Sequence, residues 1–459
     1  MTVKNSTPQG PKGYPYIGNL FNLASSQGLD WLQSVTEKYG DVAKFRIIKR
    51  NMYLINHPDL VKEVLTHKMN NYSKKTYGFK IIRTVLGESI FTAMGDTWKR
   101  KRRLAQPYFH KKIIANLAQT MTDTIDDMRQ DWAKVHAEQK HLDVGDAMMR
   151  ITLTVVVRTL FSTSLTAKEV QTVADIFTPL LKGTNNRILY PIKFLYDLPL
   201  KRNIRYKENI EELDRIILGI IKKRRTSGEK PMDLLQMLMD ARDEETGQPL
   251  NDQELRDEAM TIFIAGHETT ANAMTWLWVT LTQYPEIRSK IEAEVEEVLG
   301  SRIPVAADFP KLSYTLKAFK EILRLCPPVP VIPRRVESND IIGDYFIERG
   351  SSILFSPYLL HRHPDFWESP ETFNPNRFDK ESQRRQHPFA YLPFGGGPRI
   401  CIGNNFAMME AVFIIAMVLQ QYRLELPAQT KVRPWFKLTY RPKGPVRMKL
   451  VKKGSVENS

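Results

Sequence analysis

The stretch "FGGGPRICIG", residues 394–403, holds one of only two cysteines in a chain of 459 residues. A thiolate is a metal ligand, and a single thiolate suits haem iron whose opposite face stays open. The glycines Gly395, Gly396 and Gly397 allow backbone turns that residues with a Cβ resist, so the loop can pass close to a flat cofactor. Taken alone, Cys401 is equally well explained as a buried structural cysteine in a glycine-rich turn.

The residues around Cys401 favour a ligand role. Gly403 allows a helix to begin directly behind the sulfur, and the positive end of that helix would stabilise a thiolate. Arg399 is placed to meet a carboxylate with both of its guanidinium donors. Zinc is disfavoured, because Cys326 and Cys401 show neither a CxxC spacing nor paired histidines.

Composition narrows the class of protein. The chain is 42% hydrophobic, which is enough for a large core, and its net charge of +16 favours an acidic partner or an anionic surface. No nucleic-acid motif is present. The start of the chain has no apolar signal region, and "AVFIIAMVL" from Ala411 is too short to cross a bilayer. We therefore expect a soluble cytoplasmic protein without a transmembrane anchor, and reduced thiols.

The pattern along the chain predicts a mainly α fold with small β-sheets. We expect a helix that closes at Gly40, a hairpin around residues 49–51 and a helix that starts at Pro58. No linker or repeat divides the chain, so the prediction is one large domain over residues 1–459. Its expected parts are an N-terminal arm (1–20), a helical bulk (about 96–326), a loop- and strand-rich region with the Cys loop (327–403), and a C-terminal helix with strands (404–455).

One long helix carries polar residues at its centre. Asn251 and Glu254 have the spacing of a capping box and Pro285 marks the end, which gives roughly 32 residues or about 48 Å. The centre reads "AGHETT", and the Thr269 hydroxyl can bond to the carbonyl of Ala265 and open a groove. An acid beside a hydroxyl, as in Glu268–Thr269, is suited to proton transfer. The alternative is a helix that exposes polar residues for one turn.

Two further charged motifs flank these segments. "EILR" places Glu321 and Arg324 one helical turn apart, and Arg377 in "FNPNRF" can complete a buried charge network. "WKRKR" places Trp98 and Arg102 at i and i+4, so both can face one cofactor edge. Taken singly, a solvated ion pair and an ordinary basic helix face explain them as well.

Together, in this order and over nearly the whole chain, these motifs resemble the cytochrome P450 family. The Cys loop matches the F-x-x-G-x-R-x-C-x-G pattern of the family at five positions: Phe394, Gly397, Arg399, Cys401 and Gly403. "AGHETT", "EILR" and "NPNRF" are similar to its oxygen-activation helix, its ExxR pair and the loop partner of that pair. The resemblance implies a helical prism with haem b between the long helix and the Cys loop.

The resemblance also implies a role for each site residue. Cys401 would ligate the iron, with Phe394 packed near the sulfur and Gly403 and Ala265 against the cofactor. Glu268 and Thr269 would deliver protons. The haem propionates would be held by Arg399, Arg102, Trp98 and Arg335. Glu321, Arg324 and Arg377 would be structural.

The implied activity is the insertion of one oxygen atom from O2 into a lipophilic substrate, by hydroxylation or epoxidation. Electrons would come from an acidic ferredoxin or flavodoxin with its reductase, because no flavin or iron–sulfur module fits in the short segment after Cys401. A basic face formed by Lys99, Arg100 and Arg103 would steer that partner. A peroxide-driven peroxygenase and a non-catalytic haem sensor or carrier are the alternatives, and neither would need the Glu268–Thr269 pair.

The substrate is expected to be a fatty acid, a terpenoid or a similar molecule in an apolar pocket. The expected lining residues are Phe263, Ile264, Ala265, Val331 and Ile332. Residues 77–91 would add a lid. Lys80 or Arg83 within it could anchor a carboxylate, although a solvated surface charge is the better explanation of both.

Overall fold

The computed structural model describes residues 6–162 and 167–453, and the chain forms two compact units. Unit 1 comprises Met1–Lys80, Lys320–Cys401 and Pro434–Arg441. Unit 2 comprises Ile81–Phe319, Ile402–Arg433 and Pro442–Ser459. Helices α4 (Tyr77–Leu86) and α15 (Ser313–Leu325) each carry the chain from one unit to the other. That residues 1–459 act as a single domain stays a prediction.

Unit 1 is built on a five-stranded sheet of order β1-β2-β8-β5-β3. Its strands are β1 (Val42–Ile47), β2 (Arg50–Ile55), β3 (Tyr72–Ser73), β5 (Ile332–Val336) and β8 (Ser352–Phe355). β1 and β2 form the antiparallel hairpin expected from the sequence, and β2 pairs with β8 in parallel. The sheet therefore joins the N-terminal arm to the segment that precedes the Cys loop.

Short helices and strands surround this sheet in unit 1. The helices are α1 (Leu20–Ala24), α2 (Gly28–Tyr39), α3 (Pro58–Leu65), α16 (Pro357–Leu360) and α17 (Lys380–Arg385), with 3₁₀ turns η1 (Met69–Asn71), η4 (Pro375–Phe378) and η5 (Gly397–Arg399). The remaining strand pairs are β6 (Asp340–Ile342) with β7 (Tyr345–Ile347), and β10 (Pro434–Phe436) with β11 (Tyr440–Pro442). As the sequence predicted, α2 ends before Gly40, which has φ of +83°. Glycine adopts this conformation far more readily than other residues do.

The core of unit 1 lies on one face of the sheet. Val336, Ile353 and Phe355 are buried there with Leu65 of α3 and Leu392, two residues before Phe394. The same apolar cluster thus supports both the sheet and the approach to the Cys loop.

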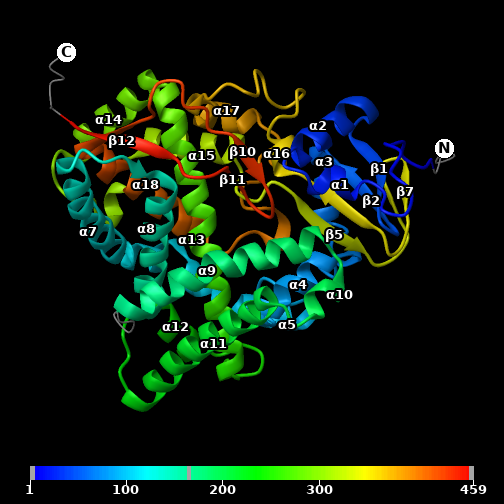
Figure 1. The fold of residues 1–459 in the computed structure, drawn as a ribbon, viewed down its shortest axis with the longest axis horizontal. Helices are drawn as coiled ribbons and strands as arrows, with labels where there is room; N and C mark the ends of the chain where they lie inside the picture. Colours follow the sequence, from blue (N-terminus) through cyan, green and yellow to red (C-terminus); the bar gives the residue numbers. More distant parts are fainter. Residues whose placement is uncertain (1–5, 163–166, 454–459) are drawn as a thin grey trace. The chain divides into compact units, whose positions relative to one another are not determined.

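Unit 2 is a bundle of helices (Figure 1). Its main helices are α5 (Gly95–Ala105), α6 (Lys111–Asn116), α7 (Ala118–Ala137), α8 (Val144–Phe161), α9 (Ala167–Leu189), α10 (Lys193–Asp197), α11 (Lys201–Ser227), α12 (Leu234–Asp240), α13 (Asp252–Gln283), α14 (Pro285–Leu299) and α18 (Asn404–Gln421). The 3₁₀ turns η2 (Gln106–Phe109) and η3 (Ala306–Asp308) connect some of them. A small sheet of order β4-β12-β9 joins β4 (Leu142–Asp143), β12 (Arg447–Lys452) and β9 (Tyr422–Glu425).

α13 is the central helix of unit 2 (Figure 1). It has the predicted 32 residues, and Asn251 and Glu254 form the predicted capping box. It packs along α8, where a Cβ at Gly266 would lie 2.8 Å from Cγ2 of Val156. Glycine at this position therefore lets the two helices approach closely.

The architecture confirms the predicted fold class, which is mainly α with small sheets. Among the described residues, no helix combines the length and the apolar character that a membrane span requires.

Candidate functional site

The Cys401 loop of unit 1 takes the conformation that its glycines predict. Gly397 has φ of +66°, and a Cβ there would lie 2.1 Å from the carbonyl oxygen of Leu65. The backbone N–H of Cys401 donates to the carbonyl of Phe394 at 2.9 Å, which closes the loop. The Cys401 side chain is exposed. The loop is therefore a tight turn that presents the sulfur at a surface of unit 1.

The second cysteine lies in a different environment. Cys326 follows α15 and is partly buried, and burial raises the pKa of its thiol to about 12. A thiol that stays protonated at neutral pH is a poor metal ligand. Cys326 is therefore a poor candidate for an iron ligand, and the assignment of Cys401 to that role stays a prediction.

Cations gather around the Cys401 loop. Lys74 is buried, and burial together with the charges of Arg334 and Arg399 lowers the pKa of its ammonium, while Cys401 acts in the opposite direction. Burial also lowers the pKa of the Arg334 guanidinium to about 10. Lys74 thus lies within electrostatic range of Arg334, Arg399 and Cys401, and basic side chains near this loop fit an anionic group such as the propionates of a haem.

This cluster differs in part from the sequence prediction. Arg334 and Arg335 are neighbours on β5, so their side chains lie on opposite faces of the strand. Arg334 is the buried one, whereas Arg335 is partly exposed. Sequence reasoning missed Lys74, because a lysine in "SKKTY" has no pattern that separates it from a solvated charge. The role assigned to Arg335 stays a prediction.

The ExxR pair forms a buried network in unit 1. Arg324 donates from Nε and Nη2 to the two carboxylate oxygens of Glu321 at 2.7 and 2.8 Å, and both side chains are 0% exposed. Its other donors reach the carbonyls of His361, Pro370 and Thr372. Arg377 lies 3.3 Å from Glu321, as the sequence suggested. The pair therefore fixes three chain segments, which agrees with the structural role expected from the sequence.

His361 connects this network to the Cys loop. Its Nδ1 donates to the carbonyl of Arg324 at 3.0 Å, and its Nε2 accepts from the N–H of Leu392 at 2.8 Å. Burial lowers the pKa of His361 to about 3, so the ring is neutral. Nothing in the sequence indicated this residue's role, because its two partners are 31 and 37 residues away.

The centre of α13 in unit 2 is open on one side. Ala265 is exposed in a helix that is otherwise mostly buried, and Ile264 and Thr269 beside it are partly exposed. The Thr269 hydroxyl donates to the carbonyl of Ala265 at 2.8 Å, as predicted. An exposed alanine at the middle of a central helix leaves room for a flat group against the backbone, which fits a haem.

The neighbours of Ala265 are packed more tightly. Glu268 is buried, and Phe263 is buried with its ring centroid 5.4 Å from that of Phe177 on α9. His267 is buried beside the same ring, and its Nδ1 lies 3.1 Å from the carbonyl of Phe263. His267 is therefore structural. Phe263 lies in a packed aromatic cluster, so its assignment to the pocket stays a prediction.

Trp98 and Arg102 lie on α5 of unit 2. Trp98 is buried, and Arg102 is partly exposed with its Nε bonded to Gln106 at 3.0 Å. Val331 and Ile332 of unit 1 are partly exposed, and Ile332 packs against the core cluster of the sheet. Gly403 of unit 2 is the N-cap of α18, as expected. The joint roles of these residues at one cofactor stay predictions.

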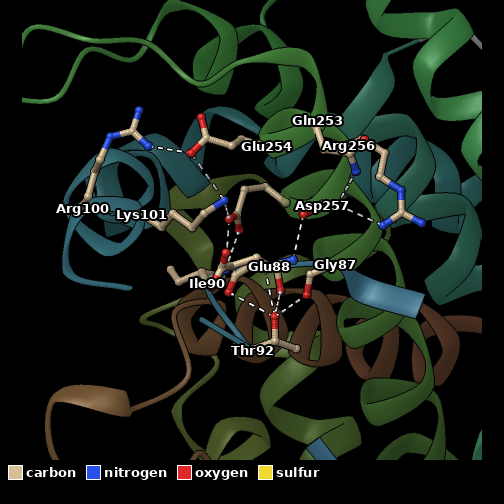
Figure 2. A network of polar contacts seen from close by, with 12 residues as sticks. Gly87, Glu88, Ile90, Thr92, Arg100, Lys101, Gln253, Glu254, Arg256 and Asp257 are labelled. Carbon is tan, nitrogen blue, oxygen red and sulfur yellow. Dashed lines mark hydrogen bonds and ion pairs between the residues drawn. The ribbon is translucent and has the colours of Figure 1, made fainter. Parts of the chain in front are cut away.

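The ion pairs of α5 correct the prediction that this helix presents a basic face. Arg100 pairs with Glu254 at 2.6 Å (Figure 2), and Lys99 pairs with Asp96 at 3.0 Å. Arg103 pairs with Asp243 and Glu245. Lys101 is buried rather than solvated. Because most of these acids come from distant segments, the sequence of the helix alone suggested more free charge than the surface carries.

Within residues 6–162 and 167–453, no group of three or more His, Cys, Asp or Glu side chains could hold a metal ion. The exposed Cys401 sulfur, the cations beside it and the exposed face of α13 each fit a haem, which would be held by one sulfur and by contacts to its propionates and faces.

Comparisons with known proteins identify the family of the chain. A family model described as Cytochrome P450 matches residues 8–450. Cyclooctatin synthase of Streptomyces melanosporofaciens is 34% identical over 439 residues, which cover 95% of this chain and 94% of that protein. Pentalenene oxygenase of Streptomyces avermitilis is 30% identical over 424 residues, 92% of each chain. The crystal structure of the cytochrome P450DA heme domain superposes with a TM-score of 0.89 at 25% identity, over 97% of this chain and 98% of that one.

Proposed function

The chain belongs to the cytochrome P450 family and is a monooxygenase, and we propose that it hydroxylates a terpenoid-like lipophile with haem ligated by Cys401. The observation that carries the ligand assignment is the loop itself. Cys401 is exposed at the end of a turn that Gly397 makes possible, with Lys74, Arg334 and Arg399 around it. When bound, haem supplies the activation of O2 for insertion of one oxygen atom into a C–H bond.

Other residues of the chain are proposed to position the Cys401 loop and to transfer protons. Glu321, Arg324 and His361 hold the Cys401 loop, because His361 links the ion pair to Leu392. On α13, the Thr269 hydroxyl lies at the open face beside Ala265 and can hold or pass a proton. Glu268 is next to it in sequence and is buried, so it is assigned the transfer of protons toward that hydroxyl.

Replacing each cysteine tests the ligand. Cys401→Ser exchanges a soft donor for a hard oxygen, so the reduced CO complex should lose the red-shifted Soret band of a thiolate-ligated haem. Cys326→Ser is the matched control and should keep the band. The opposite result for the two variants would refute the assignment of Cys401.

Replacing Thr269 tests proton delivery and separates the alternatives. Thr269→Ala removes the hydroxyl and little volume, so haem should bind while product per NADPH falls and peroxide release rises. Unchanged coupling would show that another group carries the protons. Product formation with peroxide at the rate of the NADPH-driven reaction would support a peroxygenase, and the absence of product with either oxidant would support a sensor or carrier.

Three features favour a neutral polycyclic substrate over a fatty acid. Two relatives are named for cyclooctatin and pentalenene, which are terpenoid products and substrates. Arg83, one of the two cations considered as a carboxylate anchor, is paired with Glu88. Ile264 and Ala265, at the open face of α13, are apolar.

Spectral titration distinguishes the two substrate classes. Sclareol, a cyclic C20 terpene alcohol, should give a type I spectral shift, whereas palmitic acid should give a weaker one. A stronger shift with palmitic acid that disappears in Lys80→Met would overturn the terpenoid assignment.

The electron donor is assigned to an acidic ferredoxin or flavodoxin with its reductase, docking at Lys111 and Lys112 of α6. Both lysines are exposed, and among the described residues neither pairs with a carboxylate. α6 packs on α18, and Asn405 near the start of α18 donates to the carbonyl of Phe109 at 3.4 Å. These cations thus lie near the helix that begins three residues after Cys401.

Charge reversal tests this docking site. Lys111→Glu with Lys112→Glu should slow reduction by the protein donor at low salt and flatten its salt dependence, because steering depends on unscreened charge. Reduction by dithionite should not change. Lys99→Glu, at a cation already paired with Asp96, is the control and should have the smaller effect. A larger effect of Lys99→Glu would instead indicate that the protein donor docks at α5.

A further inference from the structure

A small depression lies on the surface of unit 1, where α1 is followed by α2. Its volume is about 360 Å³, and its lining consists of Asn22, Ser25, Gln27, Asp30, Trp31 and Ser34. All six residues belong to unit 1, and none is part of the Cys401 loop or of the network around Arg324. The function proposed above therefore leaves this depression without a role.

The helical spacing of α2 explains why these side chains share one surface. Four of the six lie at positions i, i+3, i+4 and i+7, which form one face of a helix: Gln27, Asp30, Trp31 and Ser34. The opposite face supplies the residues that α2 buries: Gly28, Leu29, Leu32 and Val35. Packing of the apolar face against unit 1 therefore turns the aromatic and polar face outward.

Trp31 supplies a flat surface in this lining. Its ring is partly exposed, and its centroid lies 5.1 Å from that of the buried Phe45, with the two planes at 85°. This edge-to-face contact holds the indole in one orientation. Among the described residues, the indole N–H of Trp31 has no hydrogen-bond partner. Trp31 can therefore offer a ligand both an apolar ring face and a donor.

The polar side chains around Trp31 keep hydrogen-bonding capacity. Gln27 makes no capping bond to α2, and in the described part of the chain neither the Asn22 amide nor the Asp30 carboxylate has a partner. The hydroxyls of Ser25 and Ser34 donate to backbone carbonyls at 2.9 and 2.8 Å, so their oxygens can still accept. Donors and acceptors are thus both present around one indole.

The lining disfavours several classes of ligand. It contains no lysine or arginine that would neutralise a phosphate or a carboxylate, and no aliphatic side chain that would contact a lipophile. One carboxylate is too few for a metal ion, and no metal-binding group of His, Cys, Asp or Glu is found in the part of the chain that the structure describes. A neutral molecule with many hydroxyl groups fits, because each hydroxyl both donates and accepts, as an amide side chain does.

We propose that this depression binds a neutral pyranose sugar, with one face of the sugar ring on Trp31 and its hydroxyls bonded to Asn22, Gln27 and Asp30. The faces of a pyranose carry C–H bonds and its edge carries hydroxyls, so an indole with amides and a carboxylate beside it matches both. The binding site is separate from the chemistry assigned to Cys401. Its existence does not rest on the monooxygenase function.

Titration of the full-length haem protein with methyl β-D-glucopyranoside tests the site. We expect a Kd of about 1–10 mM by calorimetry, which is the range for a small neutral ligand. In saturation-transfer NMR, the C–H protons of the sugar ring should receive the strongest signal, because they lie on the indole. Absence of binding at concentrations well above this range would refute the proposal.

Three further ligands test the class of molecule. Glucose 6-phosphate should bind more weakly than the glucoside, because the lining has no cation for its phosphate. Cyclohexanol has a similar ring with one hydroxyl and should also bind more weakly. Choline tests whether Trp31 and Asp30 instead hold a cation. Tighter binding of any of these three ligands than of the glucoside would overturn the assignment to a neutral sugar.

Replacing Trp31 tests the contact with the sugar ring. Trp31→Leu removes the flat surface but keeps an apolar contact with Phe45, so the Kd for the glucoside should rise about tenfold. Trp31→Phe keeps an aromatic ring and should fall between wild type and Trp31→Leu. Trp435→Leu is the matched control, because Trp435 on β10 is also partly exposed in unit 1 but lies outside the lining. An equal effect of the two leucine variants would show unspecific stacking and refute the site.

Replacing the polar side chains tests the bonds to the hydroxyls. Gln27→Ala and Asp30→Ala should each raise the Kd about threefold, as the loss of one exposed hydrogen bond predicts. Both side chains are exposed, so these variants keep the test valid if Trp31→Leu fails to fold. Glu37→Ala, at an exposed acid of α2 outside the lining, is their control and should match wild type. An unchanged Kd in both Gln27→Ala and Asp30→Ala would overturn the proposed mode of binding.

Discussion

Two buried ion pairs of this protein, Arg324–Glu321 in unit 1 and Lys101–Glu258 in unit 2, use similar charges in different ways. Arg324 makes two bonds to Glu321 and three to backbone carbonyls, so it fixes distant chain segments permanently. Glu258 shares its carboxylate between Lys101 and the N–H of Ile90, in the loop between α4 and α5. Arginine presents five donors in a fixed plane, so Arg324 can hold several chain segments at once, whereas a lysine presents one ammonium group. The Arg324–Glu321 pair is therefore suited to hold several chain segments together, and the Lys101–Glu258 pair is suited to hold one loop.

The largest effect is expected for Glu321→Ala. It leaves Arg324 buried with a charge that cannot be neutralised, which should lower the free energy of unfolding by about 3–5 kcal/mol. Denaturant unfolding and the haem content of purified protein measure the loss. Glu381→Ala, which breaks an exposed pair with Arg385 in the same unit, is the control. Its expected change is about 0.5 kcal/mol. A stable Glu321→Ala variant with full haem content would show that the Arg324–Glu321 pair contributes no more to stability than the Lys101–Glu258 pair.

A smaller loss is expected for Glu258→Ala. Lys101 keeps Glu254 at 4.0 Å. Because Glu254 remains as a partner for this lysine, the free energy of unfolding should fall by about 1–3 kcal/mol. The same denaturant unfolding experiment compares the two variants. A loss equal to that of Glu321→Ala would show that the Lys101 pair is a scaffold of the same kind.

Acidification should weaken both regions through one histidine in each. Burial lowers the pKa of His361 in unit 1 to about 3 and that of His267 in unit 2 to about 4. Below a pH of about 6.5 the unfolded chain takes up protons that the folded chain excludes, so stability falls as pH falls toward these values. Each histidine contributes about 1.4 kcal/mol per pH unit in that window.

Replacing each histidine checks this pH dependence. His361→Asn and His267→Phe should each make the plot of unfolding free energy against pH less steep between about pH 6 and 4.5, whatever their effect on stability at pH 7. The slope, rather than the absolute stability, is the measurement. A slope equal to that of wild type in either variant would show that the replaced ring is protonated in the folded state.

The smallest effect is expected at a buried acid that lacks an ion pair. Glu410 of α18 is buried, and burial outweighs the nearby Thr270 hydroxyl, which favours the ionised form. Burial raises the pKa of Glu410, so its contribution to stability is present below about pH 4.3 and is lost as pH rises. Glu410→Gln should therefore stabilise the protein by about 1 kcal/mol at pH 8. A destabilised variant at pH 8 with unchanged stability at pH 4 would indicate an ionised, partnered carboxylate.

Much of the fold and of the site could be predicted from short patterns. The capping box of α13, the hairpin of residues 42–55 and the turn at Gly397 depend on residues a few positions apart. The bond from Thr269 to Ala265 spans four residues. Such features follow from helical spacing and from the conformations open to glycine.

The missed residues share one property. Lys74 and Lys101 lie in basic runs that are typical of a solvated surface, yet both are buried. Asp257 and Glu258 follow the capping box, where acids are expected for electrostatic reasons alone. His361 stands in a loop with no pattern around it. In each case the sequence shows the charge or the ring but not what it contacts.

The sequence alone therefore determined the reaction class, and it singled out Cys401 and the Glu268–Thr269 pair as the residues proposed for it, because the chemistry of oxygen activation needs those residue types at short, fixed spacings. Tertiary structure decided which charges are buried and what they hold. Glu258 meets the amide of Ile90 across 168 positions, and Arg324 meets the carbonyl of His361 across 37. Bonds of this kind form only when folded segments meet, since no local pattern specifies a partner that far away in the chain.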